Sequence, residues 1–256
     1  GVRLMRLFGD EKTQRIFSYV GPEQEYFLVD EDKYMKRPDL IYTGRTLFGA
    51  MPPKGQEMDD QYFGSIAPNV KAFMEDNIQL WKLGITAKTQ HREVAPGQHE
   101  IAPIFSVSNV ALDNNLLVMD ILKKTARKHG FVCLLHEKPF DGINGSGKHN
   151  NWSLTTDDGI NLFKPGKEPE NNKLFQLVLA CTMAAVDRHA VLLRLAASNT
   201  GNDHRLGANE APPAIISMYL GDQVGDIVDQ IIKNGKATSS LSSGTLDFGI
   251  KKLPVL

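Results

Sequence analysis

Cysteine is scarce in this sequence. Only two of its 256 residues are cysteines, Cys133 and Cys181, and both lie in apolar runs. Two such residues do not make the disulfide framework of a small secreted domain, and a chain of this length can bury a core that needs none. We therefore expect both cysteines to be reduced core residues. The sequence also lacks CxxC and HExxH segments, which removes the common zinc-site signatures.

An excess of charge of one sign is absent as well. The formal net charge is -1, with 23% charged and 41% hydrophobic residues, which is ordinary for a globular protein. This balance gives no basic footprint for a nucleic-acid partner. No block of like charge indicates binding to a membrane surface.

Long uninterrupted apolar runs are missing too. The longest candidate, Leu174 to Leu195, contains Asp187, Arg188 and His189. We therefore expect this segment to form a buried helix that does not span a bilayer. No signal peptide pattern is visible, and we expect a cytoplasmic protein.

The hydrophobic pattern predicts a single α+β domain over residues 1–256, with a mostly antiparallel sheet flanked by helices. Bulky and β-branched residues predict strands, and two alternating segments around Pro96 and Gly97 predict a hairpin. Helical spacing with Gly84, Gly130 and Gly235 as stops predicts helices. Strands are expected over 16–30 and 131–137, and the hairpin is expected within 85–105. Helices are expected over 66–84, 109–130, 172–195 and 211–235. The segment 36–62 is expected to have little regular structure.

Two pairs of glutamates stand out. Glu23 and Glu25 are two residues apart in the first predicted strand, so both point to the same face. Glu93 and Glu100 flank the predicted turn of the hairpin and can also share one side. Each pair alone has a plainer interpretation, a solvated strand face for the first and a salt-bridged surface turn for the second, the latter with Arg92 and His99 as partners.

Convergence of these carboxylates with His149 would need a counter-charge. Two like charges ~4 Å apart repel by about 4 kcal/mol at an effective dielectric near 20. Several such pairs would cancel a total stability of roughly 5–15 kcal/mol. Either the residues are far apart, or divalent cations hold them together. Oxygen ligands with one nitrogen favour Mg²⁺ or Mn²⁺ over structural zinc.

Four segments in order carry a resemblance to a known family. They are GPEQEYFLVD, EVAPGQHEIAPIF, NGSGKHNNWSL and RLGANEAPPAI, and together they resemble the catalytic domain of glutamine synthetase, closest in wording to the long type III branch. The resemblance extends from about Phe17 to the end of the chain. It implies a curved antiparallel sheet with flanking helices, as in the guanidino kinases.

The resemblance also implies roles for single residues. Glu25, Glu93 and Glu100 would hold one Mg²⁺ or Mn²⁺ ion, and Glu23 and His149 would hold a second. The remaining implied positions are Asn144, Gly145, His149 and Arg205 for the amino-acid substrate, Arg205 and Glu210 for catalysis, and Asn151, Ser153 and Phe105 for the nucleotide. Asn151 replaces a histidine that is usual in the family, and the spacing from Glu93 to Glu100 is one residue shorter than in the common bacterial type.

The implied reaction joins ammonia to L-glutamate with ATP, through a γ-glutamyl phosphate, in a cytoplasmic ring-stacked homo-oligomer. The segment 198–213 suits a lid over that reactive intermediate, and the glycines of NGSGKHNNWSL are expected to let the backbone approach a small amino acid. Because the family's N-terminal β-grasp domain and C-terminal arginine-rich stretch are not in this sequence, we expect an excised fragment that binds Mn²⁺ weakly and is inactive alone.

Two alternatives stay open. The first is a relative that joins glutamate to a larger amine, against which Glu210 argues because a negative group beside the amine entrance favours ammonium. The second is a structural or regulatory module that kept the fold and lost the activity, against which the five intact ligand positions argue.

Overall fold

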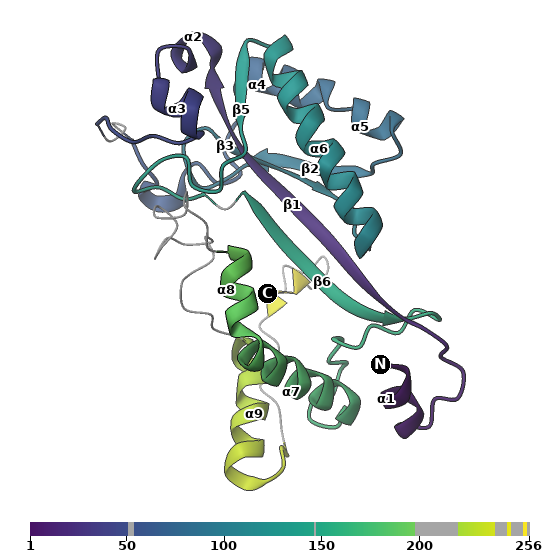
Figure 1. Ribbon diagram of the computed structural model, residues 1–256. Helices are drawn as coiled ribbons and strands as arrows, with labels where there is room; N and C mark the ends of the chain where they lie inside the picture. The colour runs from purple at the N-terminus through teal and green to yellow at the C-terminus, as the bar shows by residue number, and fades with distance from the viewer. Residues whose placement is uncertain (51–53, 146, 198–219, 239–244, 247–252, 255–256) are drawn as a thin grey trace. The chain divides into compact units, whose positions relative to one another are not determined.

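The computed structural model describes residues 1–50, 54–145, 147–197, 220–238, 245–246 and 253–254 (Figure 1). The chain forms two compact units. The first comprises Gly1–Phe17, Leu154–Leu193 and the described part of 215–256; the second comprises Ser18–Ser153 and the described part of 194–214.

The sheet of the second unit is arranged around one long strand, β1 (Ile16–Asp30). β1 pairs antiparallel with β3 (Gln98–Pro103), β4 (Ser106–Val107) and β5 (Phe131–Leu134), and it also pairs with β6 (Lys148–Thr156). β2 (Ala87–Arg92) adds to the free side of β3 and completes the predicted hairpin. The α+β class with an antiparallel sheet is thereby confirmed.

Helices cover one side of this sheet. α4 (Pro68–Asp76), α5 (Gln79–Lys82) and α6 (Ser108–Lys128) lie there together in Figure 1. The core between them and the sheet contains Tyr26, Phe73, Ile101, Val118 and Leu122. On the opposite side of β1, Phe27 and Val29 pack in a second cluster with Leu40, Ala95, Leu134 and Ile143. Even-numbered residues of β1 thus face the helices, and odd-numbered residues face the other side.

A buried amide pair joins α6 to β1. Asn115 Nδ2 donates to Gln24 Oε1 at 3.2 Å, and both residues are almost inaccessible. Gln24 Nε2 donates in turn to the carbonyl oxygen of Glu25, at 2.8 Å, and to that of Gly147. This network sets the position of the segment that leads into β6.

The other helices of the second unit precede the hairpin. They are α2 (Glu31–Tyr34), α3 (Pro38–Thr43) and the 3₁₀ helix η1 (Glu57–Asp59), so the region expected to be irregular contains some helix. Asp39 in α3 is buried and accepts from Arg37 Nη2 at 2.6 Å and from the backbone of Leu40 and Leu47. These bonds, the guanidinium above all, hold the pKa of Asp39 well below its usual value of 3.8.

The helix expected over 66–84 is interrupted. α4 ends at Asp76, and Asn77, its C-cap residue, is buried with its side chain donating to Gln90 Oε1 at 3.0 Å. The amide therefore ties the helix end to β2, and α5 starts anew at Gln79.

The first unit contains α1 (Val2–Leu7), α7 (Lys173–Arg188), the start of α8 (Ala190–Ala197), α9 (Gly221–Asn234) and the strands β7 (Thr245–Leu246) and β8 (Leu253–Pro254). Its core is small and centres on Met5, Leu162 and Val178. α9 ends as expected at Gly235, which has a left-handed φ of 73°.

The long apolar segment from Leu174 to Leu195 differs from the prediction. It forms two helices, α7 and α8, that meet at a bend of 70°. Only Phe175 and Val178 are buried in α7, whereas Leu192 and Leu195 of α8 are exposed, so the prediction of one buried helix is wrong. Within the described ranges no single helix passes a length and hydropathy test for crossing a membrane; α7 and α8 pass it only as a bent pair.

The two cysteines behave differently. Cys133 is buried in the core next to α6, and burial raises its pKa to about 12. Cys181 lies in α7 and is exposed, which corrects the expectation that both are core residues.

Candidate metal centre and substrate site

Three strands bring three of the site's side chains into one row. In the sheet register, Glu25 of β1 is the partner of Glu100 in β3, and Glu100 is the partner of His91 in β2. Directly paired residues of neighbouring strands point to the same face, with Cβ atoms about 5 Å apart. All three belong to the face opposite the helices, and all three are buried; His91 retains 9% of its exposure.

Glu93 completes this cluster. It follows β2 two residues after His91, and its backbone N–H donates to the Gln98 carbonyl at 3.0 Å. The candidate ligand atoms of His91, Glu93 and Glu100 all lie within 4.8 Å of one another. We call His91, Glu93, Glu100 and Glu25 the carboxylate cluster.

The surface-turn interpretation of Glu93 and Glu100 is excluded by this geometry. Both glutamates are buried. Arg92 donates to the carbonyl oxygen of Ser65 at 3.0 Å, and His99 stacks on Tyr26 at 5.8 Å on the helix side. Burial lowers the pKa of His99 to about 4, so this imidazole is neutral and does not offset a carboxylate.

His91 is the member of the cluster that sequence reasoning missed. Its Nε2 lies 3.2 Å from Glu100 Oε1, and its Nδ1 lies 3.8 Å from Glu93 Oε1. Burial lowers the pKa of His91, but the hydrogen bond and charge of Glu100, together with Glu93, outweigh it and raise the pKa to about 9. The sequence did contain a signal for His91: it lies two residues before Glu93 at the end of a predicted strand, a spacing that places both side chains on the same face.

Glu25 is held in place by a side chain from the neighbouring strand. Gln98 Nε2 donates to Glu25 Oε2 at 2.8 Å, and Gln98 Oε1 accepts from the backbone of Ala95 at 3.1 Å. Gln98 therefore orients a carboxylate of the cluster from the turn that also carries Glu93.

A second group lies further along β1. Glu23 Oε2 is 2.9 Å from His149 Nδ1, and Glu23 Oε1 accepts from Asn151 Nδ2 at 2.7 Å. His149, Asn151 and Ser153 alternate along β6, so His149 lies within a strand and does not merely follow one. Glu23 and His149 are partly exposed, in contrast with the carboxylate cluster.

These two groups fit divalent cations. Each offers carboxylate oxygens and one imidazole nitrogen, the mixture that suits Mg²⁺ or Mn²⁺. Three glutamates enclosed in the carboxylate cluster carry more negative charge than one imidazolium can neutralise. A bound cation would satisfy that charge.

The glycine-rich segment before β6 is shaped by a neighbouring backbone. A Cβ on Gly145 would lie 2.7 Å from the Glu137 carbonyl oxygen, and one on Gly147, which has φ +66°, would lie 2.9 Å from Glu137 Cγ. Both glycines are therefore required by contact with Glu137, a reason that differs from the expected approach to a substrate. Asn144 is buried, and its backbone N–H donates to Gln56 Oε1.

The remaining predicted site residues either lie outside the two candidate ligand groups or are not among the residues that the structure describes. Phe105 is 65% exposed and meets Tyr19 edge-on at 5.9 Å. Ser153 is half-buried on β6. Arg205, Glu210 and the whole expected lid segment, 198–213, lie outside the described residues.

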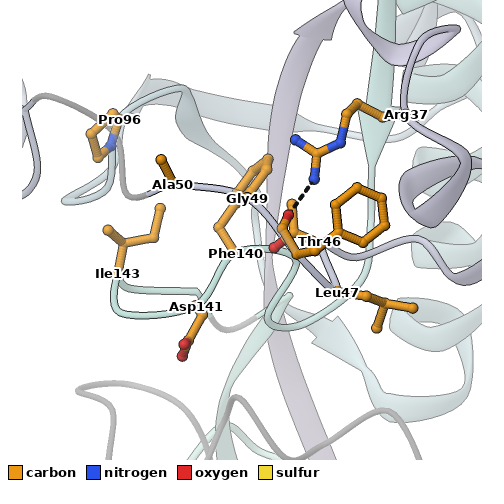
Figure 2. Close-up of a pocket in the computed structure, with 10 residues that line it drawn as sticks. Arg37, Thr46, Leu47, Gly49, Ala50, Pro96, Phe140, Asp141 and Ile143 are labelled. Atoms are coloured by element: carbon orange, nitrogen blue, oxygen red, sulfur yellow. Dashed lines mark hydrogen bonds between the residues drawn. The ribbon is translucent and has the colours of Figure 1, made fainter.

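A pocket of about 380 Å³ lies elsewhere in the second unit. Figure 2 shows Arg37 on one side of it and Asp141 on the opposite side. Arg37 donates to the Phe48 carbonyl at 2.7 Å, as well as to Asp39. None of the six residues from the two candidate ligand groups lines this pocket.

The sheet and its buried carboxylates define a domain of the α+β class with a candidate metal centre. The family model for the glutamine synthetase catalytic domain matches residues 4–217. The chain therefore belongs to the glutamine synthetase family.

Similarity to individual glutamine synthetases supports this assignment. The chain is 57% identical over 231 residues to a glutamine synthetase of Butyrivibrio fibrisolvens, covering 90% of this chain and 33% of the relative. It is 52% identical over 256 residues to the type-3 glutamine synthetase of Dictyostelium discoideum, covering 100% of this chain and 35% of the relative. The chain thus spans about a third of the length of these relatives.

Among solved structures, a complex of GmaS with ADP has the same fold. Its TM-score is 0.53 at 21% identity, over 80% of this chain and 43% of that one.

Proposed function

We propose that this chain carries the metal-dependent centre of an enzyme that joins ammonia to L-glutamate with ATP, forming L-glutamine, ADP and phosphate. The observation that carries the proposal is the buried row of Glu25, Glu100 and His91, closed by Glu93, in a chain of the glutamine synthetase family. We further propose a ring-stacked, cytoplasmic homo-oligomer for the whole protein.

The ligand groups suggest two cation positions. Glu25, Glu93 and Glu100 would hold one Mg²⁺ or Mn²⁺ ion, and Glu23 with His149 would hold another. When bound, such ions neutralise the negative charge that accumulates when a carboxylate attacks a polyphosphate. His91 orients Glu100 through its 3.2 Å contact, and Gln98 orients Glu25.

For the reaction itself, the protein must bind and orient glutamate and ATP and shield the acyl phosphate from water. The γ-carboxylate of glutamate attacks the γ-phosphorus of ATP, ADP leaves, and ammonia then displaces phosphate from the acyl phosphate. Asn144 and Gly145 would bind the amino-acid end of glutamate. Arg205 would contact its carboxylate or the phosphorylated intermediate, and Glu210 would help deprotonate ammonium.

The nucleotide is proposed to lie toward β6. Asn151 and Ser153 project from the same strand as His149, and Phe105 is available to flank the adenine. In the structure Asn151 also fixes Glu23, so its role includes orienting a candidate ligand.

The test is a phosphate-release assay on the full-length protein. We expect release to require glutamate, ammonium, ATP and Mg²⁺ or Mn²⁺ together, and Glu25→Gln to reduce it at least 100-fold with loss of Mn²⁺ binding by calorimetry. Glu75→Gln, at an exposed position of α4, is the matched control and should leave both unchanged. Release that is unaffected by Glu25→Gln would contradict the proposal. Faster turnover with methylamine than with ammonium would assign the larger-amine alternative instead.

A further inference from the structure

An aromatic ring covers one face of His91, the histidine of the carboxylate cluster. The phenyl ring of Phe63 stacks on the imidazole with 4.1 Å between the ring centroids and 19° between the ring planes. Tyr62 packs edge-on against Phe63, with 4.6 Å between their ring centroids. Phe63 thus contacts the cluster from a turn that lies outside the sheet.

The backbone also holds Phe63 next to His91. The Phe63 N–H donates to the Arg92 carbonyl oxygen at 3.1 Å, and Arg92 Nη1 donates to the Ser65 carbonyl oxygen at 3.0 Å. β2 is the end strand of the described sheet, so these bonds attach the segment 62–65 to the strand that carries His91. The ring therefore has a fixed place over the imidazole.

The backbone conformation of Phe63 is unusual for a bulky residue. Its φ is +51°, in the left-handed region that residues other than glycine rarely adopt. Such conformations cost free energy and persist where the surrounding structure requires them, often beside functional sites. The stacking on His91 and the bond to Arg92 are contacts that offset this cost.

Phe63 and Arg92 together define the orientation of the imidazole. The last torsion of a histidine side chain is broadly permitted, so neighbouring groups must set the plane of the ring. Stacking on Phe63 sets that plane. His91 Nδ1 lies 2.9 Å from the Arg92 carbonyl oxygen, which can only accept, so Nδ1 is the donor. Nε2 is then the nitrogen that faces Glu100 Oε1, at 3.2 Å.

We infer that Phe63 is a positioning residue for the candidate metal centre. Its ring holds the imidazole of His91 in the plane from which Nε2 orients Glu100, a carboxylate proposed as a cation ligand. Groups that orient metal ligands from outside the coordination shell tune the affinity for the ion, and their loss typically weakens binding about 10- to 100-fold. The inference rests on the proposed function, because it concerns the cation of that same centre.

The experiment is a calorimetric titration of the full-length protein with Mn²⁺. The parent and all variants carry Glu23→Gln, which removes the carboxylate of the second candidate position, so the titration reports the carboxylate cluster. We expect Phe63→Leu to weaken Mn²⁺ binding about 10-fold, because leucine has no flat face to stack on the imidazole. Phe63→Tyr keeps the ring and should bind Mn²⁺ as tightly as the parent. Phe48→Leu is the matched control and should change nothing, because Phe48 is 65% exposed, against 62% for Phe63, and its ring lies beside Arg37.

Electron paramagnetic resonance and thermal unfolding separate positioning from a structural role. We expect Phe63→Leu to change the zero-field splitting of bound Mn²⁺, because a reoriented Glu100 carboxylate alters the ligand geometry, whereas Phe63→Tyr should leave the spectrum unchanged. Phe63→Asn is a second variant without the ring, and asparagine accepts a left-handed backbone more readily. It should keep Tm close to that of the parent and still lose Mn²⁺ affinity. A ring with only a structural role would instead lower Tm and leave the affinity of the folded protein unchanged.

The outcomes are distinct. Unchanged Mn²⁺ affinity in Phe63→Leu and Phe63→Asn would overturn the inference, and so would equal losses in Phe63→Leu and Phe63→Tyr. If the parent binds Mn²⁺ and the two variants without the ring bind it less tightly, the inference stands even when the wild-type protein forms no glutamine and the proposed reaction fails. If the wild-type protein forms glutamine and Phe63→Leu keeps the Mn²⁺ affinity of the parent, the proposed function stands and the inference falls.

Discussion

Replacing Gln24 by leucine tests the network that places β6 beside β1. Gln24→Leu removes the two bonds from Gln24 Nε2 and leaves Asn115 Nδ2 buried without its acceptor. Each lost bond contributes about 0.5–1.5 kcal/mol, and an unsatisfied buried donor costs about 1–3 kcal/mol. We expect the free energy of unfolding to fall by about 2–4 kcal/mol. The Gly147 carbonyl still accepts from the Glu25 backbone at 3.1 Å, which limits the loss.

A double-mutant cycle gives the sharper result. Removing both amides in Gln24→Leu with Asn115→Leu leaves no donor stranded between them, so the double variant should lose about 1–2 kcal/mol less than the sum of the single variants. Urea unfolding can be followed by tryptophan fluorescence, because both tryptophans, Trp81 and Trp152, lie in the second unit. Strictly additive losses would refute a coupled amide network.

Three further predictions concern other parts of the chain. Asp39→Asn should lower the free energy of unfolding by about 1.5–3 kcal/mol at pH 7. Because the folded state holds the pKa of Asp39 down, its contribution is present above the usual value of 3.8 and is lost as pH falls through the lowered pKa, so the difference from wild type should shrink in unfolding curves below pH 4. Gly145→Ala should destabilise by about 1–3 kcal/mol in thermal unfolding, since its Cβ meets the Glu137 carbonyl oxygen; unchanged stability would show that the segment can move. A thiol reagent should modify one cysteine per folded chain, Cys181, and both only after denaturation, whereas rapid modification of Cys133 would contradict its burial.

Hydrophobic patterns and turn residues in the sequence predicted one strand, one hairpin turn and one helix end correctly. The strand over Ile16–Asp30, the hairpin turn at Pro96 and Gly97, and the end of α9 at Gly235 follow from β-branched runs and turn residues. The residues alone left open whether Glu25 and Glu100 lie close together, and only the family resemblance implied a shared site; their direct pairing is a finding of the structure.

Features that depend on distant contacts were not predictable in this way. The break after Asp76 is stabilised by a bond from Asn77 to another strand, and periodicity does not report such a bond. The glycines before β6 are explained by Glu137, which lies on the preceding segment and leaves no trace in the spacing of the motif. The pairing of His91 with Glu100 is visible only once β2 and β3 are in register.

The two faces of β1 have different roles. Gln24 and Tyr26 face the helices, whereas Glu23 and Glu25 lie on the opposite face, where the candidate metal ligands are. Inserting or deleting a single residue there would exchange the two faces of the strand. Carboxylates would then point into the hydrophobic core, and an aromatic ring would point toward the candidate metal ligands. Substitutions along β1 can therefore be accepted one side chain at a time, whereas a change in the number of residues between Glu23 and Tyr26 cannot.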